Sequence, residues 1–289
     1  MQHRSEIFVA LQRLLPQHWL SRKLARIAES RRVWLKTLLI KRAVAYFGIN
    51  LSEAERPNTD DYVSFNDFFT RALKSESRPI DAESESIVSP VDGAISQIGA
   101  IVDDQLIQAK GMHYSVGQLL GNKHMAQSYM NGRFSTLYLS PKDYHRVHAP
   151  YDCVLVRTRY IPGSLFSVNA MTTEALPTLF ARNERLVCEF ESAMGRFCLV
   201  FVGAMLVAGI QTVWNGREHP GAGSIREKEY NDTEFTFTKG SELGRFQFGS
   251  TVILLFSDKC RWLSQLNEGD SIQLGQRLGV DTSATIDTR

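Results

Sequence analysis

Hydrophobic residues recur at helical spacing in the first fifty positions. One apolar stripe runs through residues 8–15 and a second through residues 33–47, each with a repeat of three to four residues. Such a repeat predicts an amphipathic helix. Pro16 lies between the stripes and breaks a helix, because proline lacks the N–H and its ring clashes with the preceding turn. Gly48 is a suitable C-terminal stop. The pattern therefore predicts two helices, separated at Pro16, of which the second ends near Gly48.

The pattern changes after a polar, acidic segment over residues 51–62, which we interpret as a linker. Ser64 or Asn66 can cap a short helix there, and from about residue 85 short apolar runs alternate with turns that contain Gly and Pro. Runs of this kind predict strands, here over residues 134–139, 153–161, 186–191, 197–210 and 251–256. We therefore expect an α+β fold in which N-terminal amphipathic helices precede a β-rich body.

The longest run without a polar or charged residue, residues 197–210, has fourteen members. A helix needs about 20 residues to span a bilayer, and the Val, Phe and Gly content of this run suits buried strands better. We expect no transmembrane helix.

Charge is distributed unevenly along the chain. Residues 1–50 contain ten Lys or Arg and two Glu, a net charge of +8, so the rest of the chain carries −6 within a total of +2. A basic amphipathic segment in which Trp19 and Trp34 lie among Leu and Arg is typical of a helix in a lipid headgroup layer. The alternative is that these helices pack on the body with their charges in water. Nucleic-acid binding is disfavoured, because no groove-reading motif accompanies the charge.

Three segments carry residues that could do chemistry. They are Ser89-Pro90-Val91-Asp92-Gly93, Tyr144-His145-Arg146-Val147-His148-Ala149-Pro150 and Phe248-Gly249-Ser250-Thr251. Taken singly, each has an ordinary interpretation: Asp92 before a glycine is a common turn residue, the two histidines suit core or surface positions, and Gly-Ser pairs are frequent in turns. A metal site is disfavoured, because prolines bracket the histidines and no Cys or HExxH-type Glu is nearby.

Together, an Asp, a His and a Ser can form a nucleophilic relay in which the carboxylate orients the imidazole and the imidazole takes the hydroxyl proton. The setting of Ser250 differs from that of a hydrolase nucleophile, because no G-x-S-x-G elbow is present and a strand follows. A serine directly after a glycine can attack the carbonyl before it, since glycine leaves that carbonyl unshielded and tolerates a strained backbone. The combination predicts acyl transfer within the chain, at Gly249–Ser250.

The segment around Ser250 resembles the processing site of bacterial-type, pyruvoyl-dependent phosphatidylserine decarboxylases. The residues that carry the resemblance are Lys239-Gly240-Ser241-Glu242-Leu243-Gly244-Arg245-Phe246 and Phe248-Gly249-Ser250-Thr251, with Phe248 where the family usually has Leu or Val. Similar stretches are Phe65-Asn66-Asp67-Phe68-Phe69-Thr70-Arg71, the Asp92 and histidine segments, Ile161-Pro162-Gly163-Ser164-Leu165-Phe166-Ser167-Val168-Asn169 and Phe180-Ala181-Arg182-Asn183-Glu184-Arg185. The resemblance covers roughly residues 60–280 and implies a catalytic domain over residues 61–289 behind a docking segment over residues 1–60.

The resemblance implies how the chain matures. Asp92, His148 and Ser250 would form a self-cleaving triad in which His148 is the base and the Ser250 hydroxyl attacks the Gly249 carbonyl. An N-to-O acyl shift and β-elimination would then leave a β chain of residues 1–249 and an α chain of residues 250–289. The α chain would begin with a covalent pyruvoyl group derived from Ser250.

The resemblance also implies the reaction and its place. The pyruvoyl carbonyl would act as an electron sink: the amine of phosphatidylserine forms a Schiff base at residue 250, carbon dioxide leaves, and His145 donates the proton that completes phosphatidylethanolamine. Such an enzyme of phospholipid biosynthesis would lie on the cytoplasmic face of the cell membrane as a peripheral protein. Residues 1–50 would contact the anionic surface, and two copies of the β/α unit would form a dimer.

Three alternatives stay open on the sequence alone. A serine hydrolase would use the same triad on an external substrate and remain one chain. A metallopeptidase or carrier-like β module would bind zinc through His145 and His148. A non-catalytic basic membrane adaptor would not need Ser250.

Overall fold

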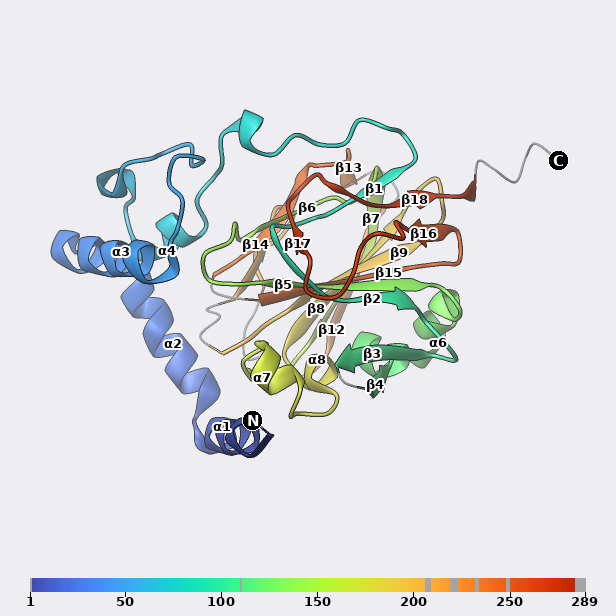
Figure 1. Ribbon diagram of the computed structural model, residues 1–289, viewed down its shortest axis with the longest axis horizontal. Coiled ribbons are helices and arrows are strands. Elements are labelled where there is room, and N and C mark those ends of the chain that lie inside the picture. The colour runs from blue at the N-terminus through green and yellow to red at the C-terminus, as the bar shows by residue number, and fades with distance from the viewer. Residues whose placement is uncertain are drawn as a thin grey trace.

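The computed structural model describes residues 2–109, 111–205, 209–218, 223–231, 234–247 and 250–283. Figure 1 shows the N-terminal helices along one flank of a strand-rich body. The order of elements, helices first and strands after them, confirms the predicted α+β fold.

Three helices form the N-terminal segment: α1 (Gln2–Leu14), α2 (Gln17–Ala28) and α3 (Val33–Phe47). Pro16 directly precedes α2, and Gly48 ends α3 in the left-handed conformation at φ 67°, as predicted. The predicted number of two helices was wrong, because the helix after Pro16 breaks at residues 29–32. Neither Gly nor Pro, the residues that most often end a helix, lies at this break. The sequence therefore does not mark the end of α2.

The largest sheet places the central strands in a fully buried layer. Its strands, each antiparallel to its neighbour, run in the order β12 (Arg226–Glu229), β7 (Cys153–Ile161), β8 (Arg185–Glu191), β9 (Phe197–Val202), β15 (Ser250–Phe256), β5 (Arg133–Leu139), β2 (Gly93–Ala100) and β17 (Ser271–Ile272), and β13 (Thr236–Phe237) also pairs with β7. Every residue of β9 and β15 is buried. Unbroken apolar runs in the sequence, rather than alternating ones, reflect this burial on both faces.

Smaller elements surround this sheet. The remaining strands are β1 (Ser86–Val88), β18 (Arg277–Asp281) and β16 (Cys260–Trp262) in one sheet, β11 (Gly216–Arg217), β10 (Ile210–Thr212), β14 (Glu242–Phe246) and β6 (Arg146–His148) in another, and the hairpin of β3 (Gln105–Ala109) and β4 (Met112–Ser115). The short helices are α4 (Phe65–Phe69), α5 (Val116–Leu120), α6 (Lys123–Ala126), α7 (Ala170–Thr173) and α8 (Leu179–Arg182), with 3₁₀ turns at Thr59–Asp61, Ser75–Ser77 and Gln127–Tyr129. Ser64 caps α4 by accepting a hydrogen bond from the Asp67 N–H (3.1 Å), as predicted.

Four of the five predicted strands are present, and the fifth prediction needs correction. The run over residues 197–210 is not one strand: β9 ends at Val202 and β10 begins at Ile210, with residues 206–208 outside the described part of the chain. Within the described ranges, the helices lack the length and hydropathy that crossing a membrane would require.

Two buried glutamines fasten the N-terminal helices to the body. The Ser167 N–H donates to Gln12 Oε1 (2.8 Å), and the Leu165 N–H donates to Gln17 Oε1 (2.7 Å). Leaving a buried N–H unpaired is costly, so these contacts fix α1 and α2 against the segment that follows β7.

Candidate active site

Three neighbouring strands end or begin at one edge of the large sheet, and this brings the predicted segments together. Ser250, the first residue of β15, pairs with Leu139, the last residue of β5. Gly93 begins β2 on the other side of β5, where an added Cβ would lie 2.3 Å from the Tyr138 carbonyl oxygen. Only glycine fits so close to a backbone. Asp92 is therefore held at the sheet edge where Ser250 begins.

The histidine segment reaches the same edge from the end of β5. Residues 140–145 turn back after Leu139, and β6 then pairs with β14. The Phe246 N–H at the end of β14 donates to the His145 carbonyl oxygen (3.0 Å). Phe246 lies four residues before Ser250, so this bond ties His145 to the segment that leads into the predicted cleavage site. Phe248 and Gly249 lie outside the described residues.

Ser250 is fully buried, and its Oγ has no hydrogen-bond partner among the described residues. The hydroxyls of Thr251 and Thr136 are buried without partners in the same sense. Buried polar groups in folded proteins are nearly always paired, and exceptions often mark catalytic positions. The hydroxyl predicted to be the nucleophile is thus one of these exceptions.

The His145 side chain is fully buried, and one of its ring nitrogens, Nε2, has no hydrogen-bond partner among the described residues. Its Nδ1 donates to the Asp143 carbonyl oxygen (2.8 Å), because a carbonyl can only accept, and its Nε2 is buried without a partner in the described part of the chain. The Phe69 ring lies 4.1 Å from the imidazole, centroid to centroid. Burial lowers the pKa of His145 to about 3, so at neutral pH the imidazole is uncharged and Nε2 carries a lone pair.

His148 has partners at both ring nitrogens. Its Nδ1 donates to the Gly240 carbonyl oxygen (2.7 Å), which fixes the tautomer, and its Nε2 lone pair accepts from the Tyr144 hydroxyl (3.1 Å). Burial lowers the pKa of His148, so this ring is also neutral at pH 7. The basic nitrogen of His148 is therefore Nε2, and Tyr144 occupies it.

Asp92 is bound by an arginine rather than by His148. The Arg78 guanidinium donates from Nε (2.9 and 3.0 Å) and Nη2 (2.6 Å) to the Asp92 carboxylate, which also accepts from the Leu274 N–H (2.9 Å). The Arg78 Nη2 also forms an ion pair with the Glu53 carboxylate (2.8 Å). Among the described residues, no hydrogen bond joins His148 to either Asp92 or Ser250. The structure thus places Asp92 and Ser250 at one edge of the large sheet and links His148 of the smaller sheet to Pro90 (2.9 Å), without a bonded relay among the three side chains in the described residues.

Two of these contacts were missed by reasoning from the sequence. Tyr144 lies within the histidine segment, and that position alone could have suggested that its hydroxyl contacts a histidine. Arg78 lies fourteen residues before Asp92 with no pattern that links them.

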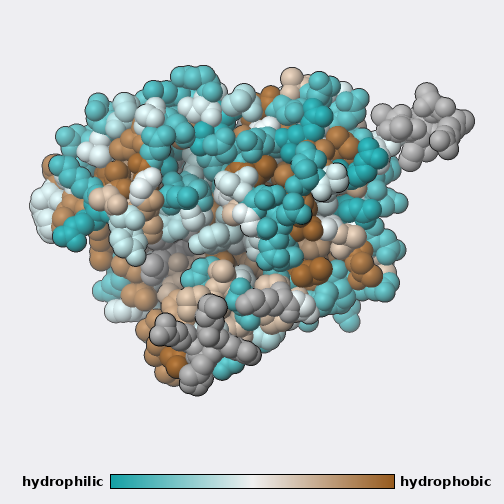
Figure 2. Space-filling model, viewed as in Figure 1, coloured by the Kyte–Doolittle hydropathy of each residue, from teal (hydrophilic) through white to brown (hydrophobic). Residues whose placement is uncertain are grey.

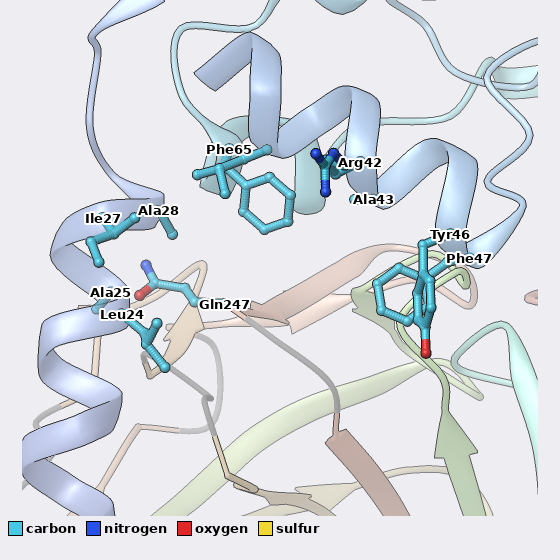
Figure 3. A pocket seen from close by; sticks show the side chains of 11 residues that line it. Leu24, Ala25, Ile27, Ala28, Arg42, Ala43, Tyr46, Phe47, Phe65 and Gln247 are labelled. Atoms are coloured by element: carbon cyan, nitrogen blue, oxygen red, sulfur yellow. The ribbon is translucent and has the colours of Figure 1, made fainter. Parts of the chain in front are cut away.

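An apolar pocket of about 300 Å³ opens beside this site between α2, α3 and α4. Figure 3 shows Leu24 and Ile27 from α2, Tyr46 and Phe47 from α3, and Phe65 from α4 around it. Gln247, three residues before Ser250, also lines the pocket, and its Oε1 is buried without a partner in the described ranges. The pocket therefore connects the N-terminal helices to the segment that precedes Ser250.

The chemistry available here is acid–base and nucleophilic. In the part of the chain that the structure describes, no group of three or more His, Cys, Asp or Glu could hold a metal ion. His145 precedes β6 and His148 ends it, and their bonds run to different carbonyls.

Comparisons with known proteins agree over nearly the whole chain. A family model described as phosphatidylserine decarboxylase matches residues 65–280, and a model described as PSD matches residues 7–48. The phosphatidylserine decarboxylase proenzyme of Acinetobacter baylyi is 48% identical over 281 residues, 97% of each chain. Proteins of the same name from Alcanivorax borkumensis (47% over 287 residues, 98% of this chain and 99% of the other) and Hahella chejuensis (45% over 285 residues, 97% and 96%) are similar to the same extent.

Proposed function

The chain belongs to the phosphatidylserine decarboxylase family, and we propose that it cuts itself between Gly249 and Ser250 and then converts phosphatidylserine to phosphatidylethanolamine and carbon dioxide. One observation carries the proposal for the cut. Ser250 begins a buried strand, directly after a glycine, with a hydroxyl that has no partner among the described residues.

The cut balances with the atoms of the chain alone. The Ser250 Oγ attacks the Gly249 carbonyl carbon and loses its proton to a base, the peptide C–N bond breaks, and the nitrogen takes a proton to become an amine. A base then takes the α-proton of residue 250, and β-elimination of the ester releases the Gly249 carboxylate, which keeps the Ser250 Oγ, and leaves a dehydroalanyl residue. Water then replaces its nitrogen with oxygen and releases ammonia. The products are a β chain of residues 1–249 and an α chain of residues 250–289.

We assign the role of base to His148, and one contact and one pKa shift support it. The Gly240 carbonyl holds the Nδ1–H tautomer, and the lowered pKa keeps Nε2 unprotonated. The Tyr144 hydroxyl must first leave Nε2 before the Ser250 proton can reach it. Asp92, held by Arg78, acts as the third member through its negative charge at the same sheet edge.

A pyruvoyl group at residue 250 fits this environment, because the site is fully buried and the hydroxyl of the next residue, Thr251, has no hydrogen-bond partner among the described residues. The carbonyl of such a group would supply an electron sink for the electron pair that stays on the substrate carbon when carbon dioxide leaves. His145 is the proposed proton donor to the substrate carbon. With a pKa of about 3 in the uncut chain it must first gain a proton, which a negatively charged substrate beside the imidazole would favour.

We further propose that the N-terminal helices bind an anionic membrane surface on the cytoplasmic side. Large apolar side chains are exposed on all three helices and at Leu15 between α1 and α2; those on the helices are Ile7, Leu11, Leu14, Trp19, Ile27, Val33, Trp34, Leu38 and Tyr46. Figure 2 shows apolar surface along the flank where these helices lie. Exposed cations alternate with them, among them Arg22, Lys23 and Arg26. Apolar and basic residues on one face suit insertion among anionic headgroups, each cation contributing about 1 kcal/mol.

Separate histidine variants test the two stages. His148→Ala should remain one uncut chain, because the base is lost. His145→Ala should be cut but should release carbon dioxide from phosphatidylserine about 10²–10⁴-fold more slowly. Identical behaviour of the two variants, read by denaturing electrophoresis and by carbon dioxide release, would refute this division of roles.

A further inference from the structure

A polar pocket of about 170 Å³ lies between the end of α3, the residues after α4 and the start of β2. Three cations and three carboxylates line it: Arg71, Arg78, Lys142, Glu53, Asp92 and Asp143. The formal charges sum to zero, so the character of the pocket depends on which of these groups are already paired.

Most of the charged groups have partners. Arg78 is bound to both Asp92 and Glu53. The Asp143 carboxylate accepts from the backbone N–H and the hydroxyl of Ser140, each at 2.7 Å. Arg71 and the exposed Lys142 are therefore the two cations of the pocket with no carboxylate bound to them among the described residues, and the Asp143 carboxylate is bound only by neutral donors.

Arg71 is the exception to this pairing. It is only 3% exposed, and its Nη2 donates to the Lys142 carbonyl oxygen (3.2 Å). Its Nε and Nη1 are buried and have no hydrogen-bond partner among the described residues. A buried guanidinium with open donors is an expensive arrangement, and its planar fork matches the oxygens of a phosphate or carboxylate.

The pocket lies beside the proposed site of reaction. The segment that carries Arg71 packs on the histidine segment, since Phe69 contacts the His145 ring and the Arg146 Nε donates to the Thr70 carbonyl oxygen (2.9 Å). Gly93 lines the pocket, and Ser250 lies two strand spacings away across β5, about 10 Å. In a serine headgroup the phosphorus is four bonds, about 5 Å, from the amine nitrogen, and the phosphate oxygens reach further towards Arg71.

We propose that this pocket binds the phosphodiester of the substrate headgroup, with Arg71 as the residue that donates to its oxygens. The inference rests on the proposed function, because it places the amine of the headgroup at residue 250. Binding the phosphodiester would pair the open donors of Arg71 and hold the headgroup at a fixed distance from His145.

Enzyme kinetics on three variants of the full chain test this assignment. Arg71→Gln removes the charge and the fork, and Arg71→Lys keeps the charge only. Arg56→Gln is the control, because Arg56 pairs with Asp67 of α4 and neither residue lines the pocket. We expect Arg71→Gln to be cut normally and to raise the KM for short-chain phosphatidylserine about 10- to 100-fold, the loss of charged hydrogen bonds. Arg71→Lys should raise KM less, and Arg56→Gln should keep the KM of the unaltered enzyme.

Soluble inhibitors identify the ligand. Glycerophosphoserine should compete with substrate in the unaltered enzyme and lose potency in Arg71→Gln, whereas inorganic phosphate should inhibit far more weakly. Equal potency of inorganic phosphate would assign the pocket to a free oxyanion and overturn the headgroup assignment, and an unchanged KM in both Arg71 variants would overturn the role of Arg71. If Arg71→Gln fails to fold, Arg71→Lys alone decides by its KM. Intact mass distinguishes failure of the headgroup assignment from failure of the proposed function. If the protein without substitutions remains uncut, the proposed function itself is refuted.

Discussion

Replacing Tyr144 by phenylalanine should speed up the cut at Ser250, because the Tyr144 hydroxyl occupies the basic nitrogen of His148. The bond is 3.1 Å long, Tyr144 is only 5% exposed, and the opposite nitrogen of the ring is committed to the Gly240 carbonyl. His148 Nε2 must give up this bond before it can accept the Ser250 proton. In the proposed mechanism, the strength of this one hydrogen bond therefore slows the cut.

The size of the effect follows from that bond. A hydrogen bond in a folded protein contributes about 0.5–1.5 kcal/mol net, and a barrier lowered by that amount corresponds to a rate increase of about 2- to 13-fold. The Phe variant removes only the hydroxyl and keeps the ring that packs 5.6 Å from His148, centroid to centroid. It should also lower the free energy of unfolding by about 1 kcal/mol.

The assay is a time course of cutting after synthesis of the chain in a cell-free system, followed by denaturing electrophoresis. Tyr151→Phe is the matched control, because its hydroxyl is also buried and donates to Asp281 (3.2 Å) rather than to a histidine. That variant should be cut at the rate of the unaltered chain. Slower cutting of Tyr144→Phe would refute the reasoning and would show that the Tyr144 hydroxyl relays the proton.

Two further predictions concern pH and membranes. The folded-state pKa of His145 is about 3, below the usual value near 6.5, so the unfolded state binds the extra proton between these values. The free energy of unfolding of an uncut variant should therefore fall with decreasing pH in this window by up to about 1.4 kcal/mol per pH unit. Chemical denaturation should show a smaller slope of this free energy against pH for His145→Asn. An equal slope in the two proteins would contradict the argument that burial lowers the pKa of His145. Replacing three exposed cations of α2 by Gln should weaken binding to anionic vesicles at low salt by about 100-fold and much less at high salt; unchanged binding in a vesicle sedimentation assay would leave α2 as a packing helix only. The three cations are Arg22, Lys23 and Arg26.

Local chemistry made much of the fold predictable. Gly48 ends α3 because glycine adopts the left-handed conformation without strain, and Ser64 caps α4 because its side chain pairs an orphan N–H. The strands around residues 134–139 and 251–256 follow from apolar runs between turns. Each of these signals lies within a few residues of the feature that it predicts.

Contacts between distant segments could not be predicted in the same way. The break between α2 and α3 has no Gly or Pro to mark it. The partner that fixes the His148 tautomer, Gly240, lies 92 residues further along the chain, and the arginine that binds Asp92 belongs to an irregular segment before β1. Such pairs depend on how the strands are ordered, which periodicity does not report.

For the candidate residues too, the sequence predicted which residues matter but not how they contact one another. Asp92, His148 and Ser250 were selected by residue type and by resemblance. The structure places Asp92 and Ser250 at one edge of the large sheet, and His148, which ends β6 of a smaller sheet, donates its backbone N–H to the Pro90 carbonyl oxygen (2.9 Å), two residues before Asp92. Their roles as a triad, the role of His145, the boundary near residue 60, the association of two copies and the placement on a membrane stay predictions.

Intact mass spectrometry of the purified, denatured protein tests the central claim most directly. The account predicts two chains, residues 1–249 and residues 250–289, with the smaller chain lighter by one ammonia than a chain that begins with serine. The Ser250→Ala variant should appear as a single chain of full length. A single unmodified chain from the unaltered sequence, or a smaller chain that begins with an intact serine, would contradict the account.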